Sequence, residues 1–225
     1  MRPIAHIQSP FREKFGVPRQ AGLADCEARI VFEPEYRTAE AVRGLEEFEY
    51  VWLVWLFHLV DGGGEFRPTV RPPRLGGNSR VGVFATRSPF RPNPIGLSSV
   101  RLLRIDIEAG LGPVLYVAGA DLVDGTPILD IKPYIPYADA HPDVRAGFAQ
   151  QEPTPLAVAD PERHLEHLPA ELRRTAEGAL GADPRPHYHN DPERVYAMSL
   201  GEWTVRFRVE DGRVWVSACE KGNMS

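Results

Sequence analysis

The sequence predicts a mainly β protein in which a barrel or curled sheet is followed by a small α+β domain. Up to about residue 137 the apolar segments are short and strand-like, and Pro or Gly interrupts nearly every connection. Seven such segments with a single short helix are typical of a barrel or of a curled sheet with covered edges. Beyond residue 160, apolar residues spaced by three and four precede two or three further strand-like segments, which predicts a helix beside a small sheet.

The first part of the chain contains the strands expected in the barrel. They cover residues 4–8, 28–32, 50–59, 80–86, 98–107, 114–122 and 128–131. The third of these is apolar at both alternating positions, which is typical of a central strand with both faces buried, so it should form the core. Residues 38–45 are expected to form the one short helix, because Thr38 can cap its start and Gly44 helps to end it.

The domain division follows from length and composition. A chain of 225 residues is long for one domain, which predicts a large domain over residues 1–140 and a small one over residues 161–225. Residues 141–160 are rich in Ala, Pro, Gln and Asp and are expected to be the linker. The small domain should hold a helix over residues 161–180, then strands at residues 194–199, 203–209 and 214–218, with Asp211-Gly212 as a hairpin turn.

Composition excludes several classes of protein. Hydrophobic residues make up 43% and charged residues 25%, with a mean hydropathy of −0.29, which argues against a disordered or fibrous chain. The most apolar run, residues 51–60, contains His58 and is too short for a membrane span. The first six residues lack the features of a secretory signal, so we expect a cytoplasmic protein. Cys26 and Cys219 match no metal spacing, so we expect two unpaired thiols and no metal.

The net charge of −5 hides a strong segregation of charge. Between residues 66 and 105 there is no Asp or Glu, but there are eight arginines. A guanidinium binds phosphates and carboxylates through two hydrogen bonds and stacks on bases, so this stretch indicates an anionic or nucleotide partner. A compositional bias, since Lys is scarce, explains the choice of arginine but not the missing acids. The eight are Arg67, Arg71, Arg74, Arg80, Arg87, Arg91, Arg101 and Arg104.

Two loops combine rigid backbone with polar side chains. Residues 15–20 place Arg19 and Gln20 beside a permissive Gly and a rigid Pro, although a solvated loop has the same composition. Residues 86–98 contain three prolines within six residues, between polar side chains held in fixed directions. Such rigid loops hold small ligands without a large ordering entropy, so the second loop favours a binding function.

The third segment, residues 121–137, has a turn at Asp124-Gly125 followed by a strand. Its polar side chains Asp130, Lys132 and Tyr134 alternate, so they lie on one face. A solvated sheet edge would also produce this alternation.

Together with residues 71–78 and 83–88, these three segments resemble the TsaA-like family. The resemblance covers residues 1 to about 140 and continues through the Asp-Pro-Arg-Pro run at residues 183–186 and through residues 194–198. It implies a β-barrel that binds S-adenosylmethionine and works as a homodimer with the cofactor near the subunit interface. It also implies methyl transfer to the N6 nitrogen of threonylcarbamoyl-adenosine at tRNA position 37. The sequence has no Gly-x-Gly-x-x-Gly fingerprint of a doubly wound methyltransferase.

The same resemblance implies which residues bind the cofactor. They are Pro18, Arg19, Gln20, His58, Leu59, Arg87, Leu97, Asp124, Gly125, Thr126 and Pro127. Position 59 often holds an acidic or amide residue in the family, so Leu59 is a departure that leaves His58 as the polar group there. We expect Asp124 to bind the ribose or amino group, the backbone of residues 125–127 to bind the adenine edge, and Leu97 to line the sulfonium arm.

The expected reaction is an in-line displacement at a methyl carbon, in which alignment provides most of the rate. The N6 nitrogen loses a proton at some stage, and Asp130 or Tyr134 at the barrel mouth are the expected acceptors. The residues expected to bind tRNA are Arg67, Arg71, Arg74, Arg80, Arg91, Asn93 and Lys132.

Apolar loop residues near the mouth, such as Phe90, Ile95 and Leu97, favour coverage by a second subunit. The alternative function is a non-catalytic RNA- or nucleotide-binding regulator on the same barrel. Such a protein should have broken cofactor motifs, whereas the motifs of this sequence are intact.

Overall fold

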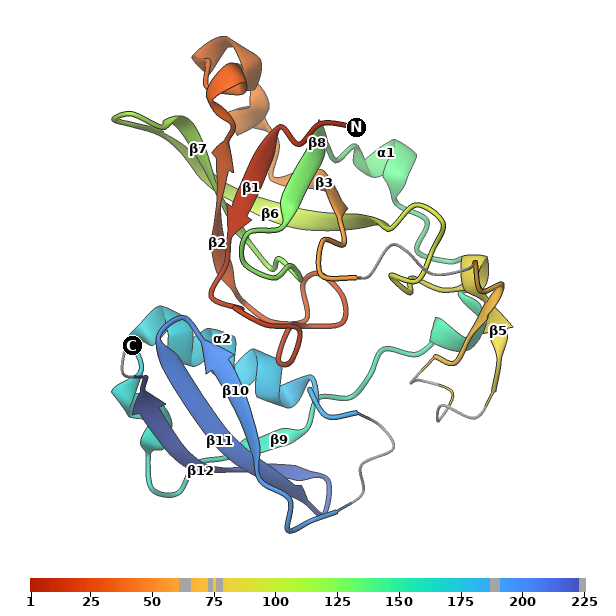
Figure 1. Ribbon diagram of the computed structural model, residues 1–225, viewed down its shortest axis with the longest axis vertical. Coiled ribbons are helices and arrows are strands. Elements are labelled where there is room, and N and C mark those ends of the chain that lie inside the picture. The colour runs from red at the N-terminus through yellow and green to blue at the C-terminus, as the bar shows by residue number, and fades with distance from the viewer. Residues whose placement is uncertain (61–65, 73–74, 76–78, 187–190, 223–225) are drawn as a thin grey trace.

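The computed structural model of the chain contains a closed β-barrel and a second domain of one sheet and one helix (Figure 1). It describes residues 1–60, 66–72, 75, 79–186 and 191–222. The mainly β fold class with a small α+β domain is therefore confirmed. Among the described residues no helix is both long and apolar enough to cross a membrane.

Six antiparallel strands close the barrel in the order β1-β2-β7-β6-β3-β8. Inward residues alternate with outward ones, as period-two patterning requires; on β3 the inward residues are Val51, Leu53 and Trp55. Strand β3 lies between β6 and β8, as expected of a central strand, but its outward residues are only half-buried. The strands are β1 (Ala5–Gln8), β2 (Glu27–Phe32), β3 (Tyr50–Leu56), β6 (Ile95–Glu108), β7 (Gly112–Ala118) and β8 (Pro127–Pro133).

The predicted strand at residues 80–86 is wrong. Only β5 (Val81–Gly82) is extended, it pairs with β4 (Thr69–Val70) in a separate two-stranded sheet, and Val83–Ala85 form a 3-10 turn. Prolines at residues 68 and 72 flank β4 and lack the amide hydrogens that a barrel neighbour would need. The described part of the barrel therefore has six strands instead of seven.

The predicted helix at residues 38–45 is replaced by three 3-10 turns, Pro34–Tyr36, Ala39–Val42 and Leu45–Glu47. Thr38 bonds through its hydroxyl to the carboxylate of Glu40 instead of capping backbone amides. Gly44, with φ of 83°, separates the second turn from the third, so no segment is long enough to become an α-helix.

The second domain has its own core. Its sheet has the order β10-β11-β12-β9, with β9 parallel to β12, and the hairpin turn at Asp211-Gly212 forms as predicted. The helix predicted over residues 161–180 is α2, preceded by a 3-10 turn at His164–His167. Strand β9 falls inside residues 141–160, so the end of the predicted linker belongs to this sheet. The elements are β9 (Ala157–Ala159), α2 (Ala170–Gly181), β10 (Tyr196–Leu200), β11 (Trp203–Glu210) and β12 (Arg213–Lys221).

Short helical turns mark the chain between the two domains, namely α1 (Pro136–Asp139) and a 3-10 turn at Gly147–Ala149. The two domains also meet through the loop that joins β1 to β2. Phe11 and Cys26 of this loop are buried in the core of the second domain, and Figure 1 shows the loop between the barrel and α2. Cys26 and Cys219 are free thiols, as predicted, and burial raises the pKa of Cys26 to about 12.

Candidate functional site

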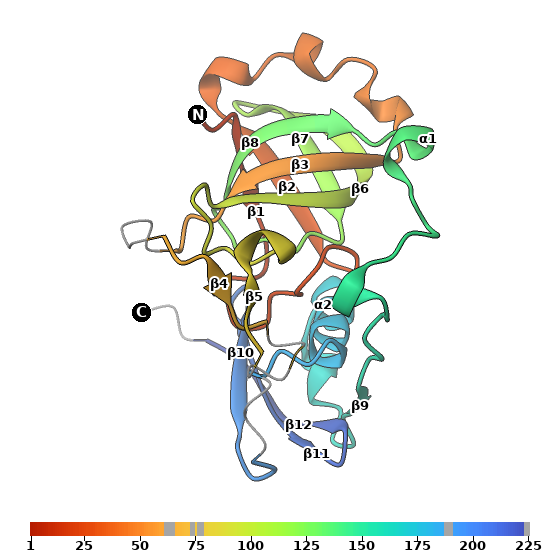
Figure 2. The ribbon, with the colours of Figure 1, turned by 90° about the vertical axis from the view of Figure 1, so that its right-hand side faces the viewer.

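One end of the barrel collects the three segments that the sequence distinguished. The connections over residues 9–26, 57–94 and 119–126 join β1 to β2, β3 to β6 and β7 to β8. Because neighbouring strands are antiparallel, all three connections leave from the same end, which faces the second domain (Figures 1 and 2). We call it the three-loop end. The opposite end carries residues 33–49 and the chain after β8.

A chain of polar contacts runs from this end into the barrel. Trp55 donates through Nε1 to the hydroxyl of Ser98 at 3.0 Å, and Ser98 donates to Oδ1 of Asp121 at 2.5 Å. Burial raises the pKa of Asp121, although the hydroxyl of Ser98 and the charge of Arg87 both oppose this effect. Arg87 in turn donates to the side-chain oxygen of Gln20, so residues from all three loops meet here.

Asp121 was not among the predicted site residues. Its signal in the sequence is a single acid between Ala120 and Leu122, both of which are buried. A carboxyl group in such an apolar run needs a partner or a function. Asp121 is half-buried and accepts a hydrogen bond from Ser98. It therefore extends the predicted site toward the barrel interior.

The turn at Asp124 is fastened to the end of β1. Its carboxylate accepts a hydrogen bond from the amide of Ser9 at 2.9 Å, and its own amide donates to Phe11 at 2.7 Å. The amide of Gly125 donates to Ile7 at 2.9 Å, and Gly125 adopts a φ of 73° that favours glycine. These amide hydrogens are already used, and the carbonyl oxygens of Val123 and Thr126 already accept hydrogen bonds, so the turn can offer a ligand the carbonyl oxygens of Asp124 and Gly125 and the second carboxylate oxygen of Asp124.

His58 and Thr126 approach each other beside this turn. The hydroxyl of Thr126 lies 3.4 Å from Nδ1 of His58 and donates to a carbonyl oxygen of its own turn at 2.6 Å. Partial burial lowers the pKa of His58, and the charges of His6 and Lys14 lower it further, which favours the neutral imidazole. The ammonium of Lys14 bonds to the backbone oxygen of Leu59, whose side chain is exposed.

The tip of the first loop is held by the second domain. Arg19 donates from Nη2 to the carbonyl oxygens of Asp183 at 3.3 Å and Arg185 at 2.9 Å, while Pro18 is buried. Asp183 has a φ of 51°, and its carboxylate accepts two hydrogen bonds from the guanidinium of Arg185. Arg19 therefore links the two domains, and Gln20 is the residue that contacts Arg87.

The same loop packs its aromatic residue into the second core. Phe15 stacks on Tyr196 with ring centroids 6.1 Å apart and on Phe207 at 6.3 Å. Gly16, with φ of 94°, leaves no space for a side chain, because an added Cβ would lie 2.5 Å from Met198. The second domain thereby fixes the position of residues 15–20.

The outward face of β3, β6 and β8 carries other predicted residues. Register places Leu97, Val54 and Asp130 in one row across the three strands, and 55% of Leu97 is exposed. Asp130 forms an ion pair with Lys132 at 2.9 Å, so this predicted tRNA contact is paired within the chain.

The structure does not bring Tyr134 to the three-loop end. It follows the last residue of β8 at the opposite end of the barrel, where its ring packs against Trp52 at 5.6 Å and Tyr50 at 6.3 Å.

The described arginines of the acid-free stretch differ in their environments, and Arg87 contacts Gln20 as described above. Arg91 donates to the carbonyl oxygen of Thr86 at 2.7 Å and so stabilises its own loop, next to the exposed Asn93. Arg74 lies outside the described residues. Four other arginines are exposed and form no hydrogen bond or ion pair with the described residues. Three of them were predicted to bind tRNA, namely Arg67, Arg71 and Arg80, and the fourth is Arg101.

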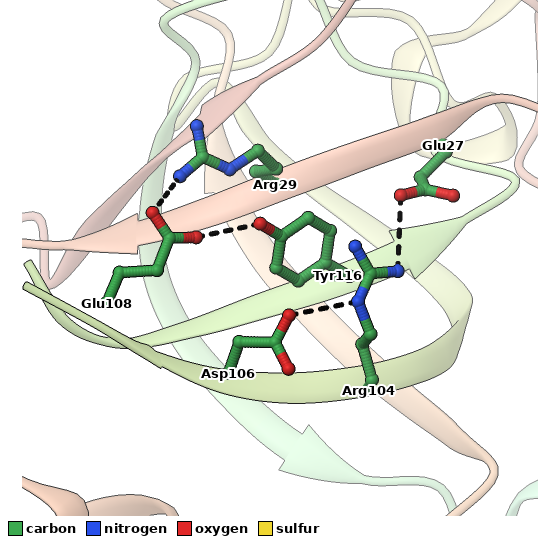
Figure 3. Close-up of polar contacts among 6 residues, drawn as sticks. All are labelled: Glu27, Arg29, Arg104, Asp106, Glu108 and Tyr116. Atoms are coloured by element: carbon green, nitrogen blue, oxygen red, sulfur yellow. Dashed lines mark hydrogen bonds and ion pairs between the residues drawn. The ribbon is translucent and has the colours of Figure 1, made fainter. Parts of the chain in front are cut away.

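Arg104, the last of the eight, is neutralised by acids from outside the stretch. Figure 3 shows it between Glu27, at 3.3 Å, and Asp106, at 3.0 Å, with its guanidinium 3.5 Å from the ring centroid of Tyr116. In the same network Glu108 accepts from Tyr116 at 2.7 Å and from Arg29. The arginines without a partner among the described residues therefore lie before β6 and in its middle, at Arg101, whereas Arg104 further along the strand is paired.

The second domain has a hollow of about 430 Å³, which is a weaker candidate for a ligand site than the three-loop end. Most of its charged lining is bonded within the chain: Asp160 accepts two backbone amides, Arg163 pairs with Glu166, and Arg173 donates to two carbonyl oxygens. Among the described residues no group of three or more His, Cys, Asp or Glu side chains is arranged to hold a metal ion.

The chemistry at the three-loop end suits a zwitterionic nucleoside ligand. Arg87 can bind a carboxylate, Gln20 and Asp124 can bind amino or hydroxyl groups, and Leu97 offers an apolar wall nearby on β6. Carbonyl oxygens of the Asp124 turn are suitable acceptors for an exocyclic amino group. The residues present therefore fit S-adenosylmethionine.

Comparison with known proteins gives matches to both parts of the chain. The tRNA-methyltransferase O N-terminal domain matches residues 6–140, and the TrmO C-terminal domain matches residues 153–222. A tRNA (adenine(37)-N6)-methyltransferase of Escherichia coli K12 is 46% identical over 229 residues, covering 96% of each chain. One of the same name from Eikenella corrodens is 51% identical over 172 residues, covering 76% of this chain and 96% of the relative.

A relative from Pseudomonas aeruginosa, named as a candidate S-adenosylmethionine-dependent methyltransferase, is 46% identical and covers 91% of this chain and 90% of its own. Among solved structures, a crystal structure of TrmO from P. aeruginosa superposes with a TM-score of 0.76 at 37% identity, covering 98% of this chain and 95% of the other.

Proposed function

The chain belongs to the tRNA-methyltransferase O family, and from this premise we propose that it transfers a methyl group from S-adenosylmethionine to the N6 nitrogen of adenosine 37 in tRNA. The finer part of the proposal is that this nitrogen already carries a threonylcarbamoyl group. The observation that carries the proposal is the match of both domains to this family, together with full-length relatives named for this reaction. Because tRNA is the substrate, the proposal also places the protein in the cytoplasm.

The residues proposed to hold the cofactor are those that converge at the three-loop end. Arg87 and Gln20 are assigned to the methionyl part, Asp124 to a ribose hydroxyl or amino group, and Leu97 to the apolar wall of the sulfonium arm. When bound, S-adenosylmethionine supplies an electrophilic methyl group. The fastened turn at Asp124 contributes a fixed backbone, which lowers the entropy lost when a ligand is oriented.

Removal of the N6 proton is assigned to Asp130 in preference to Tyr134. Asp130 shares a row with Leu97 across β3, so its side chain lies on the same outward face as the apolar wall proposed for the sulfonium arm, and it forms an ion pair with Lys132 at 2.9 Å. The position of Tyr134 at the other end of β8 does not support a role beside the cofactor.

The proposal is tested by mass spectrometry of nucleosides from tRNA incubated with the protein and S-adenosylmethionine. We expect methylated threonylcarbamoyl-adenosine when the tRNA has been threonylcarbamoylated beforehand, and no methylated product from tRNA without that group. Methylation of unmodified adenosine would contradict the finer part. Tight binding of tRNA and cofactor without methyl transfer to either tRNA would identify a non-catalytic regulator instead.

A further inference from the structure

An exposed aromatic pair lies on the segment between β3 and β6. The rings of Phe66 and Phe84 stack with centroids 6.2 Å apart and an interplanar angle of 25°, yet 55% of Phe66 and 71% of Phe84 is exposed. The neighbouring Val83 fills the local core and is 1% exposed. Two large apolar rings that contact each other in solvent are not needed for folding and indicate a binding surface.

The backbone holds this pair in place. The amide of Val83 donates to the carbonyl oxygen of Pro68 at 2.9 Å, which extends the short β4–β5 ladder and brings the flanking Phe66 and Phe84 together. Phe84 itself belongs to the 3-10 turn Val83–Ala85, and Arg91 lies with its guanidinium 5.8 Å from the centroid of the Phe84 ring. A ring fixed in this way loses little entropy when a flat ligand stacks on it.

The surroundings of the pair are positive and contain no acid from the same stretch. Arg67, Arg71 and Arg80 are exposed and form no ion pair with the described residues. Phe84 precedes Arg87 by three residues, which limits their Cα separation to about 10 Å. Aromatic faces beside unpaired guanidinium groups are the combination that binds single-stranded nucleic acid, through base stacking and phosphate contacts.

We propose that Phe66 and Phe84 form a stacking site for an unpaired RNA base, with Arg67, Arg71 and Arg80 binding the adjacent phosphates. This site rests on the proposed function, since it would hold a loop base near adenosine 37 while that adenosine enters the three-loop end. At this pair the charge favours RNA over a second copy of this chain, because a twofold contact centred on Phe66 and Phe84 would bring Arg67, Arg71 and Arg80 of both copies together, whereas the expected homodimer contact lies at Phe90 and Leu97.

The test measures fluorescence anisotropy of a labelled RNA hairpin with the sequence of an anticodon stem-loop, using the full-length protein. We expect Phe84→Ala to weaken binding by roughly 5- to 150-fold, since removing a stacked aromatic residue costs about 1–3 kcal/mol per base. Phe84→Trp should retain binding, because it preserves the stacking face. The matched control is Phe48→Ala, since Phe48 is 36% exposed at the opposite end of the barrel, and it should bind like the wild type.

Two further measurements separate stacking from charge. Binding to the same RNA strand annealed to its complement should be unchanged in Phe84→Ala, because no base is then free to stack. The salt dependence of hairpin binding should also stay unchanged in Phe84→Ala, whereas Arg80→Ala should reduce its slope by about 0.7. Equal losses on hairpin and duplex, or a reduced slope in Phe84→Ala, would overturn the stacking site.

The stacking site and the proposed function fail in different ways. If the wild type methylates tRNA and Phe84→Ala binds the hairpin like the wild type, the stacking site is wrong and the function stands. If hairpin binding depends on Phe84 but no tRNA is methylated, the function is wrong and the stacking site stands. If light scattering shows that Phe84→Ala dissociates an oligomer whose RNA affinity is otherwise unchanged, the pair packs against a second copy and the stacking site is wrong.

Discussion

Asp121 and Arg87 are the two residues on which the chemistry of the three-loop end depends most. One is a carboxyl group whose pKa is raised by burial, and the other is a guanidinium that lies near it and bonds to Gln20. The two residues affect different properties of the protein. The raised pKa of Asp121 makes the stability depend on pH, whereas Arg87 is exposed and can exchange its bond to Gln20 for a bond to a ligand.

Asp121→Asn should become more stable relative to the wild type as pH rises. Above the ordinary pKa of aspartate, about 3.9, the unfolded chain loses this proton, whereas the folded protein keeps it until its raised pKa. The folded state thus binds more protons in that window, so the unfolding free energy falls as pH rises through it. Denaturant unfolding of both proteins from about pH 4 to about pH 8 measures this. A difference that is constant across the range would contradict the burial argument.

Arg87→Ala should weaken binding of S-adenosylmethionine by about 10- to 100-fold, because hydrogen bonds to charged groups contribute about 1.5–3 kcal/mol. Isothermal calorimetry measures the affinity. Arg80→Ala is the control, since Arg80 is exposed and is proposed to bind RNA phosphates and not the cofactor, so the cofactor affinity of this variant should be that of the wild type. Equal affinities in both variants and the wild type would remove Arg87 from the cofactor site.

At the scale of single elements, β3 and β6 approach each other closely at Gly96. Gly96 pairs with Trp55, and the indole occupies the space that a side chain at Gly96 would need. The indole is thereby aimed at Ser98, the next inward residue on β6, and through it at Asp121. A glycine in β6 is therefore required by a close approach and not by its backbone angles.

Gly96→Ala should reduce the unfolding free energy by about 1–3 kcal/mol, the usual cost of overpacking a core. An added Cβ would lie 2.2 Å from the Trp55 ring, so the ring or the strand has to move. Gly82→Ala is the matched control, because nothing lies within 4 Å of a Cβ built there. Denaturant melts should separate the two variants, and similar stabilities would show that the indole moves aside at little cost.

At the scale of the whole molecule, the second domain holds a loop of the barrel. Residues 15–20 are fixed by aromatic stacking at Phe15 and by the hydrogen bonds of Arg19 to Asp183 and Arg185. The loop then presents Gln20 to Arg87. The second domain therefore positions part of the candidate cofactor site without lying in the barrel.

Arg19→Ala should loosen this loop while leaving the barrel folded. We expect faster proteolysis within residues 9–26 and a cofactor affinity lowered roughly 2- to 10-fold, since two hydrogen bonds of about 1 kcal/mol each are lost at an exposed site. Arg12→Ala, at an exposed position of the same loop, is the control and should behave like the wild type. If cofactor affinity were unchanged in a loop that is cleaved faster, the loop would not belong to the site.

The homodimer expected from the sequence is a prediction at the same scale. Phe90 is 63% exposed and Leu97 is 55% exposed, and both lie on or beside the proline-rich loop. A twofold contact would bury this patch on both subunits, so light scattering should give about twice 25.1 kDa for the wild type and a smaller mass for Phe90→Asp. A wild type that is monomeric at micromolar concentration and fully active would show that one chain contains the complete site.

Local patterns in the sequence determined most of the secondary structure and the family of this protein. Alternation predicted most barrel strands, the Asp211-Gly212 turn and the amphipathic helix, because period and turn chemistry are properties of adjacent residues. The rare strings at residues 15–20, 71–78, 83–98 and 121–137 together indicated the family whose model matches the chain. The strand predicted at residues 80–86 failed because a strand also needs a partner that can bond to it, which the prolines around β4 limit.

Only the tertiary structure decided which of these residues act together. The burial of Asp121, the neutralisation of Arg104 by Glu27, and the use of Arg19 as a link between domains all depend on partners far away in the sequence. Charge and polarity are visible residue by residue, but whether a charge is free, paired or buried is set by what the closed barrel and the second domain bring against it. The sequence therefore determined the fold and the family, and long-range packing decided the arrangement of the site.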